Sequence, residues 1–343
     1  MITKKEIKEI DKFLSEASNP LFLYDDDCDG FCAYLLLKKH YKKGEGMIIK
    51  SSPKLDVNAV HSVIEAKPDL VVILDKPLVS QEFIDQVRTP IIWLDHHPVQ
   101  SMNNVNYYNP RKHRSNRPTT YLAYSVVKSN LWLAVIGCVF DHFVPDFIND
   151  FIKQYPDLLS KAPKDIDDIK FSGDVGKLIR IFSFNLKGKI SDVKDSLKAL
   201  EKIDSPYEIL NQSSDNGKYI YSRYEKLNKD YLELLNYAKS QITEEKVFVF
   251  KYPSSNTSFT GELSNELIHL YQDKIIVIAR LKDDEYRISF RSSKINIRKV
   301  LEKALVGIEG YAGGHDHACG GAIKTHNFDQ FIENVKRLVS KKK

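Results

Sequence analysis

Short apolar runs alternate with longer stretches of helical spacing through the first 140 residues of the chain. The runs at 21–24, 69–75 and 90–97 have the length and composition of buried strands, and those at 46–49 and 105–108 fit shorter strands. Strands separated by helices in this way predict a parallel α/β sheet, because parallel neighbours need a crossover connection. We expect the helices of this region at 3–16, 31–37, 57–66, 80–87, 119–128 and 131–140.

The second half of the chain predicts a separate unit. Residues 146–214 are polar and helical in spacing, and they carry no motif that points to chemistry. Residues 218–243 contain few helix breakers and predict one long connecting helix. A new α/β pattern begins near residue 246, with strands at 247–250, 274–281 and 285–290 and helices at 261–271, 295–305 and 328–339. We therefore expect a parallel-sheet domain over 1–217, a connecting helix over 218–244 and a smaller α/β domain over 245–343.

Composition adds limits to this picture. The length of 343 residues suggests two domains, and 42% hydrophobic with 28% charged residues is usual for a soluble protein. The net charge of +5 is compatible with a phosphate-bearing partner. Residues 1–9 are charged and do not resemble a signal peptide, and the apolar run at 131–140 is about half the length that crosses a bilayer. We expect a cytoplasmic protein without membrane contact.

The cysteines do not form the paired spacing of a zinc site. We interpret them as buried free thiols in a reducing compartment, although Cys28 and Cys32 lie close enough to an acidic turn that a ligand role stays open. The cysteines are Cys28, Cys32, Cys138 and Cys319.

The most informative stretch joins the strand at 21–24 to the helix at 31–37. It places Asp25, Asp26, Asp27 and Asp29 within five residues, directly before Gly30. Carboxylates so close repel one another unless a cation lies among them, and a divalent metal with hard oxygen ligands is the natural candidate. The alternative is an acidic turn that caps the following helix, where Asp is favoured in any case.

Two further strands end in groups of the same kind. The run at 69–75 ends in Asp75, and the run at 90–97 ends in Asp95, His96 and His97. The carboxyl ends of parallel strands meet at one edge of the sheet, so we expect these side chains to converge on one site. Asp141 follows the apolar helix at 131–140 and is either a helix cap or one more ligand.

These motifs in this order, followed by Gly313-Gly314-His315, resemble the DHH/DHHA1 phosphoesterase family, most closely its RecJ-like single-strand exonuclease branch with the archaeal members. The resemblance implies a DHH domain, a DHHA1 domain and two divalent ions, Mn²⁺ or Mg²⁺. Oxygen ligands with one or two imidazoles suit Mn²⁺ better than zinc. The metal ligands implied by the resemblance are Asp25, Asp27, Asp29, Asp75, His96 and Asp141.

The resemblance also implies catalytic and substrate-binding residues. Asp95 would orient His96, His97 would face the metals and the substrate, and His315 would contact the scissile phosphate. The alternative is a surface turn for Gly313-Gly314-His315, an exposed arginine for Arg291 and a solvated loop for the basic stretch 111–117. The implied substrate contacts beyond the catalytic residues are Arg291, Ser292, Gly313, Gly314, His315 and, within the basic stretch 111–117, Arg114.

Three features depart from the family. Ala312 replaces the first glycine of the GGGH motif, which a negative φ would tolerate. Lys76-Pro77 follows Asp75 where small residues are usual, so the loop there should differ in shape. We also expect no appended oligonucleotide-binding fold of the kind that bacterial RecJ carries.

The leading hypothesis is a two-metal phosphodiesterase that cleaves single-stranded DNA or RNA from an end. One alternative is a phosphodiesterase for short oligonucleotides or dinucleotides. Another is a structural partner of replication or repair proteins, which the presence of all the implied metal ligands disfavours. The motif at 313–315 argues against a family II pyrophosphatase.

Overall fold

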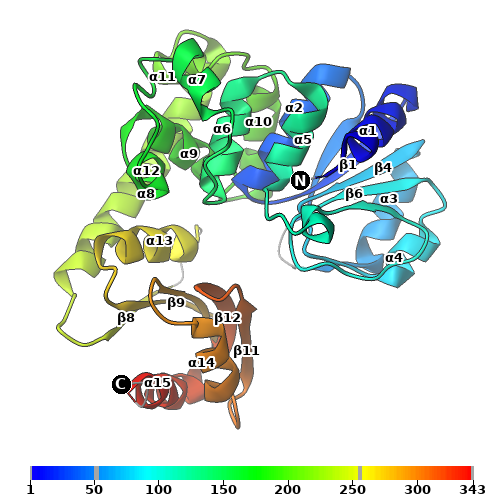
Figure 1. Cartoon of the computed structure of the whole chain (residues 1–343). Helices are drawn as coiled ribbons and strands as arrows, with labels where there is room; N and C mark the ends of the chain where they lie inside the picture. Colours follow the sequence, from blue (N-terminus) through cyan, green and yellow to red (C-terminus); the bar gives the residue numbers. More distant parts are fainter. Residues whose placement is uncertain (1, 50–53, 254–256, 341–343) are drawn as a thin grey trace. The chain divides into compact units, whose positions relative to one another are not determined.

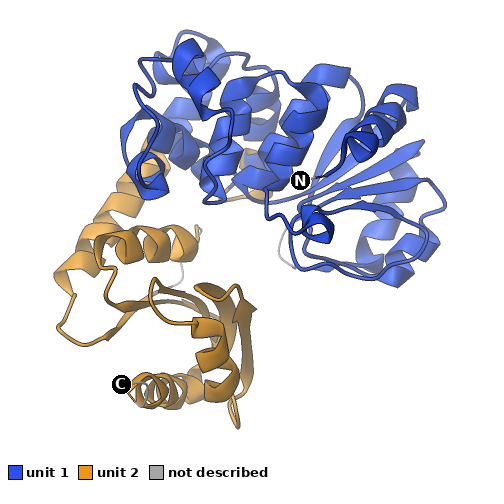
Figure 2. Ribbon diagram, in the orientation of Figure 1, with its two compact units in different colours: residues 1–186, 193–224 blue, residues 187–192, 225–343 orange. Residues whose placement is uncertain are grey.

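The computed structural model describes residues 2–49, 54–253 and 257–340. The chain divides into two compact units (Figure 2). Unit 1 comprises residues 1–186 and 193–224, and unit 2 comprises residues 187–192 and 225–343. The long helix α12, Asp215–Ser240, runs from the first unit into the second. It corresponds to the long helix expected at 218–243.

Unit 1 is built on a five-stranded sheet with the order β2-β1-β4-β6-β7 (Figure 1). Every neighbouring pair in it is parallel, as the alternating pattern predicted. The strands are β1 Pro20–Asp25, β2 Glu45–Ile49, β4 Leu70–Leu74, β6 Ile91–Leu94 and β7 Asn106–Tyr108. The α/β fold class with a parallel sheet is thereby confirmed.

The central strands are apolar throughout because side chains from both faces of the sheet are covered. Leu23, Ile73 and Trp93 belong to one buried cluster beneath the sheet. On strand β1 the alternate side chain Tyr24 stacks on Tyr34 of helix α2 with ring centroids 4.7 Å apart. Burial on both sides explains why these runs show no polar alternation.

The helices of unit 1 follow the expected rhythm, with small differences. A capping box of Thr3 and Glu6 starts the first helix, within the range expected for it. The helix expected at 57–66 begins as a 3₁₀ turn, Val57–Ala59, and two short parallel strands, β3 Lys54–Leu55 and β5 Leu78–Val79, flank this region. The α-helices are α1 Lys4–Glu16, α2 Cys28–Tyr41, α3 Val60–Ala66, α4 Gln81–Gln86, α5 Thr119–Val127, α6 Leu131–Phe140, α7 Ile148–Gln154, α8 Ile166–Lys170, α9 Gly173–Asn185, α10 Ile190–Glu201 and α11 Pro206–Leu210.

Unit 2 has a mixed sheet with the order β11-β12-β10-β9-β8. Strands β8 and β9 are parallel and the remaining neighbours are antiparallel. The glycine-rich stretch at 310–324 forms the hairpin of β11 and β12. The elements are β8 Val247–Tyr252, α13 Thr260–Leu270, β9 Ile275–Lys282, β10 Glu285–Ser292, α14 Ile297–Ala304, β11 Gly310–Gly314, β12 Ala318–Lys324 and α15 Thr325–Ser340.

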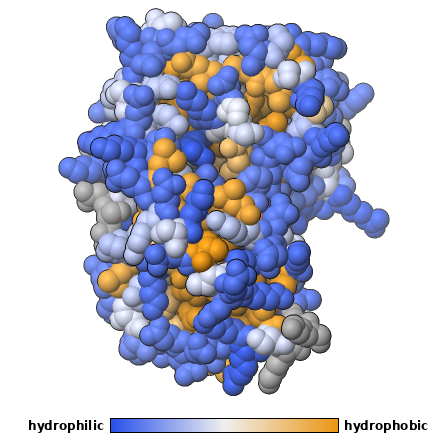
Figure 3. All heavy atoms as spheres, turned by 90° about the vertical axis from the view of Figure 1, so that its left-hand side faces the viewer, coloured by the Kyte–Doolittle hydropathy of each residue, from blue (hydrophilic) through white to orange (hydrophobic). Residues whose placement is uncertain are grey.

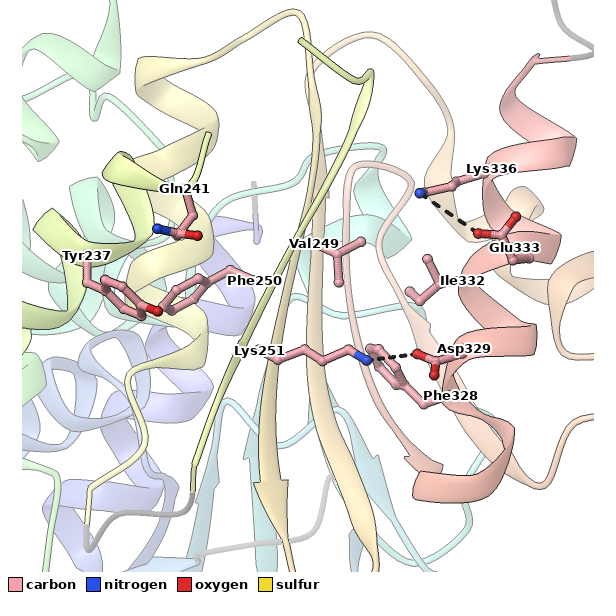
Figure 4. Close-up of a pocket in the computed structure, with 10 residues that line it drawn as sticks. All are labelled: Tyr237, Gln241, Val249, Phe250, Lys251, Phe328, Asp329, Ile332, Glu333 and Lys336. Carbon is pink, nitrogen blue, oxygen red and sulfur yellow. Dashed lines mark hydrogen bonds and ion pairs between the residues drawn. The ribbon is translucent and has the colours of Figure 1, made fainter. Parts of the chain in front are cut away.

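A groove of about 470 Å³ lies along the edge strand β8 in unit 2, lined also by α15 and the end of α12 (Figure 4). Its charged side chains are paired: Lys251 lies 2.7 Å from Asp329, and Lys336 lies 3.0 Å from Glu245 and 3.9 Å from Glu333. The groove therefore offers little net charge to a ligand, and the metal-ligand groups of the described residues lie elsewhere.

The face drawn in Figure 3 is mostly hydrophilic, with hydrophobic side chains scattered over it in small areas. Among the helices that the structure describes, none combines the length and the apolar character required to cross a bilayer.

Candidate metal centre

Four of the six expected metal ligands come together at the carboxyl edge of the unit 1 sheet, three carboxylates around one imidazole nitrogen. His96 follows β6, and its Nε2 atom lies 3.4 Å from Asp75 Oδ1, which follows β4. The same nitrogen lies 3.6 Å from Asp141 Oδ2 at the end of α6 and 3.9 Å from Asp29 Oδ2 in the first turn of α2. We call these four residues the His96 group.

The carboxylates at this edge of the sheet repel one another when no cation lies among them. Burial, followed by repulsion from neighbouring carboxylates, raises the pKa of Asp75 and of Asp141 well above the usual range. Burial and the charges of Asp25 and Asp29 raise the pKa of Asp27 to about 7. A divalent ion removes this penalty, and three carboxylates with one imidazole are a donor set that fits Mn²⁺ well and Mg²⁺ acceptably.

Asp29 and Asp75 are held by the start of helix α5. The two carboxylate oxygens of Asp29 accept the backbone N–H groups of Thr119 and Thr120, each at 2.8 Å. The Thr119 hydroxyl donates to Asp75 Oδ1 at 2.9 Å. These two threonines were missed in the sequence analysis, because their only signal is a position at a predicted helix start.

Asp27 also has a local role. Its Oδ1 accepts the N–H of Gly30 at 3.0 Å and so caps helix α2. The helix-capping alternative and the metal alternative for the acidic turn are thus compatible, since a carboxylate has further lone pairs available.

Asp25 does not lie in the His96 group. Lys76, which has no exposed surface, places its Nζ 2.6 Å from Asp25 Oδ1. Burial raises the pKa of Asp25, and the charge of Lys76 acts in the opposite direction. Lys76 follows Asp75, whose φ of 60° is the left-handed conformation that side-chain-bearing residues seldom adopt. Lys76, which departs from the small residues usual in the family, therefore changes the charge beside the acidic turn as well as the shape of the loop.

Asp95 orients a different histidine from the one we expected. Its Oδ1 lies 2.8 Å from His97 Nδ1, and its Oδ2 accepts bonds from Tyr107 and Asn109. Burial alone would lower the pKa of His97, but the bond to Asp95 and the surrounding carboxylates raise it. The turn after β6 brings His97 back to this carboxylate, and an orienting role of Asp95 toward His96 stays a prediction.

Within the basic stretch 111–117, the side chain that reaches a metal-ligand residue is not the expected one. Arg114 is exposed, whereas Arg111 is half-buried and its Nε donates to the carbonyl oxygen of His96 at 2.6 Å. Arg111 and Lys170 supply positive charge that partly offsets the raised pKa of Asp141. The sequence pointed to the basic stretch but not to the residue within it that reaches the site.

The expected substrate contacts in unit 2 fall into two groups. Arg291 bonds inside the unit, with Nε 2.6 Å from Asn265 Oδ1 and Nη1 2.8 Å from the Phe290 carbonyl, and burial lowers its pKa to about 10. The Ser292 hydroxyl accepts the N–H of Ile295 at 3.1 Å. These contacts give both residues a structural role.

The second group lies at the tip of the β11–β12 hairpin. Gly313 and Gly314 end β11, and His315 is exposed in the turn that follows. Gly314 has a φ of 142°, and an added Cβ would lie 2.5 Å from the Ala318 carbonyl oxygen, so glycine is required there. Ala312 lies in β11 and is not among the residues with a positive φ. The backbone at this position therefore tolerates the methyl group of alanine.

Comparison with known families identifies the C-terminal part. A family profile described as the DHHA1 domain matches residues 244–341. This part of the chain is a DHHA1 domain. Comparison with curated proteins gave no match.

Solved structures show the same fold over the whole chain. RecJ of Thermus thermophilus bound to Mn²⁺ has a TM-score of 0.72 at 15% identity, covering 99% of this chain and 55% of RecJ. A DHH domain described as belonging to a family of ribosomal proteins has a TM-score of 0.69 at 14% identity, covering 98% of this chain and 90% of that one. PggH of Vibrio cholerae, a pGpG-specific phosphodiesterase, has a TM-score of 0.54 at 13% identity, covering 94% of this chain and 99% of PggH.

The chain thus spans about half of the Thermus RecJ structure and nearly all of the two smaller ones. At these identities the comparison establishes the architecture. The chain shares the fold of these structures, with a parallel-sheet part followed by the part that matches the DHHA1 domain.

Proposed function

We propose that the chain is a metal-dependent phosphodiesterase that hydrolyses single-stranded nucleic acid from an end. The observation that carries the proposal is the His96 group, in which three buried or half-buried carboxylates lie within 3.9 Å of one imidazole nitrogen. A bound divalent ion there would supply Lewis-acid stabilisation of the phosphate and a hydroxide-like water at neutral pH.

The chain's own residues would support this chemistry in defined ways. Asp95 holds His97 through Nδ1 and raises its pKa, which favours an imidazolium beside the phosphate. That imidazolium would stabilise the developing negative charge or donate a proton to the leaving oxygen. Thr119 fixes Asp75 against rotation. Arg111 would contribute a second positive charge near the phosphate.

Two observations support a nucleic acid strand as the substrate. The fold similarity to Mn²⁺-bound RecJ and the net charge of +5 favour a nucleic acid strand, and by the same similarity a role in DNA repair or replication. A second candidate is a dinucleotide, because PggH is a dinucleotide phosphodiesterase by name and this chain covers 99% of it.

The test is product length over time from end-labelled single-stranded DNA, the matching RNA and a dinucleotide, each with Mn²⁺, Mg²⁺ or EDTA. Asp75→Ala and His96→Ala are the inactive variants, and Asp85→Ala on the exposed face of α4 is the matched control. We expect metal-dependent release of mononucleotides from the long strand, lost in both cluster variants.

The other outcomes are equally informative. Cleavage of the dinucleotide alone would replace the exonuclease proposal with the small-substrate one. Absence of cleavage on every substrate, with metal bound, would contradict both and favour a structural role in a replication or repair complex.

A further inference from the structure

The buried lysine beside the metal centre is the feature that neither the fold nor the proposed chemistry explains. Lys76 is fully buried, and its Nζ lies 2.6 Å from Asp25 Oδ1. An ammonium group removed from water is stable only when an opposite charge and hydrogen bonds replace the lost hydration. Asp25 supplies that charge, so the two side chains depend on each other.

This ion pair divides the acidic edge into two parts. On one side Asp25 is paired with Lys76. On the other side, each of the three carboxylates of the His96 group lies within 3.9 Å of His96 Nε2. The residues of this group, together with His97, make up the potential metal-ligand groups found among the described residues. Asp25 is absent from those groups. One part therefore already has a cation from the protein, and the other has a donor set suited to a metal ion.

We propose that the Lys76 ammonium takes the place of the second divalent ion, so that the chain binds a single divalent ion, in the His96 group. The inference rests on the proposed metal-dependent function and replaces the two-ion centre that the sequence resemblance implied.

Electrostatics supports the substitution. The charge of Asp25 contributes to the raised pKa values of both Asp27 and Asp75. Asp25 therefore interacts electrostatically with the carboxylates of the metal centre. A second divalent ion bound at Asp25 would have to displace an ammonium that has no exposed surface, or else bind next to it. Like charges a few ångströms apart in a buried site repel strongly, because little water screens them.

The left-handed turn at Asp75 keeps the lysine in this place. With a φ of 60°, Asp75 turns the chain sharply at the end of β4, and the next residue reaches the end of β1. Strands β1 and β4 are direct neighbours in the sheet, with Tyr24 paired to Leu74. The backbone conformation at Asp75 therefore places the Lys76 ammonium at the edge of the sheet, next to the end of β1.

The test is the number of Mn²⁺ ions bound at saturation, measured by equilibrium dialysis with elemental analysis and by electron paramagnetic resonance. The variants are Lys76→Met, which keeps the stem and removes the charge, and Lys76→Arg, which keeps the charge. We expect one tightly bound Mn²⁺ in the wild type and in Lys76→Arg. Lys76→Met should bind a second Mn²⁺ about 100-fold more tightly than the wild type does, with the spin coupling of ions ~3.5–4 Å apart.

Asp25→Asn separates this proposal from a general effect on folding. In the Lys76→Met background, where no buried ammonium loses its partner, it should remove the second Mn²⁺ and leave the first in place. Two tightly bound, spin-coupled Mn²⁺ ions in the wild type would overturn the inference and leave the proposed function intact. No bound Mn²⁺ in the wild type would overturn the proposed function and the inference with it. Because wild-type stoichiometry decides by itself, a variant that does not fold leaves the proposal falsifiable.

Discussion

At the scale of single residues, the contact between Asp95 and His97 determines how the imidazole can act. Asp95 is fully buried and accepts from Tyr107 and Asn109 as well as binding His97 Nδ1. The carboxylate therefore fixes the ring orientation and requires the Nδ1 position to carry the proton.

Asp95→Asn tests this role. The amide keeps the size of the side chain but removes the charge that raises the pKa of His97, so we expect kcat to fall about 10²–10⁴-fold. The affinity for Mn²⁺ should fall less than kcat does, because Asp95 lies outside the His96 group. Rate measurements at saturating Mn²⁺ and a metal titration check both parts. Asp85→Asn is the exposed control, and an unchanged pH–rate profile in Asp95→Asn would contradict the role.

The raised pKa values of the carboxylates give a prediction for stability. Their folded-state values lie above the unfolded ones, Asp27 at about 7 from 3.8, so the folded chain holds more protons than the unfolded chain between these values. Stability without metal must then fall as pH rises from 5 to 8, by on the order of 2–4 kcal/mol.

Denaturant unfolding in EDTA at several pH values measures this slope. Mn²⁺ should reduce it, since the ion compensates the repelling charges, and Asp27→Asn should reduce it in EDTA. A metal-free protein that gains stability toward pH 8 would show that these carboxylates do not control its pH dependence.

Residue-level pairings were the least predictable part of the site. Asp75 and His96 could be found because each ends an apolar run. The pairing of Lys76 with Asp25 joins residues 51 positions apart and depends on strand order and on the left-handed turn at Asp75. Thr119 and Arg111 reach the site through similar long-range geometry. Local sequence patterns do not indicate such contacts.

At the scale of elements, hydrophobic periodicity identified most strands and helices because burial on the sheet dictates it. The strands end earlier than the apolar runs, at Leu74 and Leu94, since the polar residues that follow must turn toward the edge of the sheet. The glycine-rich stretch at 310–324 was harder, because glycine permits a loop as readily as a strand. Its hairpin is fixed by pairing with β10, which only the assembled sheet provides.

The hairpin tip supplies a matched pair of substitutions. An added Cβ at Gly314 meets the Ala318 carbonyl oxygen at 2.5 Å, and its φ of 142° disfavours any other residue. An added Cβ at Gly313 meets nothing within 4 Å. We expect Gly314→Ala to destabilise unit 2 by about 1–3 kcal/mol and Gly313→Ala by less than about 0.5 kcal/mol.

Urea unfolding of the full chain, followed by far-ultraviolet circular dichroism, compares the two variants. Equal stability of Gly314→Ala and Gly313→Ala would mean that the hairpin tip is not the rigid turn described above. A loss of strand cleavage in Gly313→Ala without loss of stability would support a substrate contact at this tip.

At the scale of the whole molecule, the sequence predicted an α/β protein with a parallel sheet and a second α/β part, and both are present. Residues 146–214 had no assigned role, and their helices now have a packing role. Phe182 of α9 lies 6.2 Å from Phe31 and 5.9 Å from Trp132 between ring centroids, and Ser183 lies 3.2 Å from Cys28. These helices therefore cover α2 and α6, the two helices that carry Asp29 and deliver Asp141. Helical spacing alone could not show which surface they would cover.

The most direct test of the account is the Mn²⁺-dependent rate of mononucleotide release from end-labelled single-stranded DNA, compared between the wild type, His96→Ala and His113→Ala. His113 is a histidine of unit 1 that pairs with Glu6 outside the cluster, so it is the matched control. The account predicts release that EDTA abolishes, a loss of at least about 10³-fold in His96→Ala, and a near wild-type rate in His113→Ala. Release that persists in EDTA or in His96→Ala would contradict a metal centre built on His96.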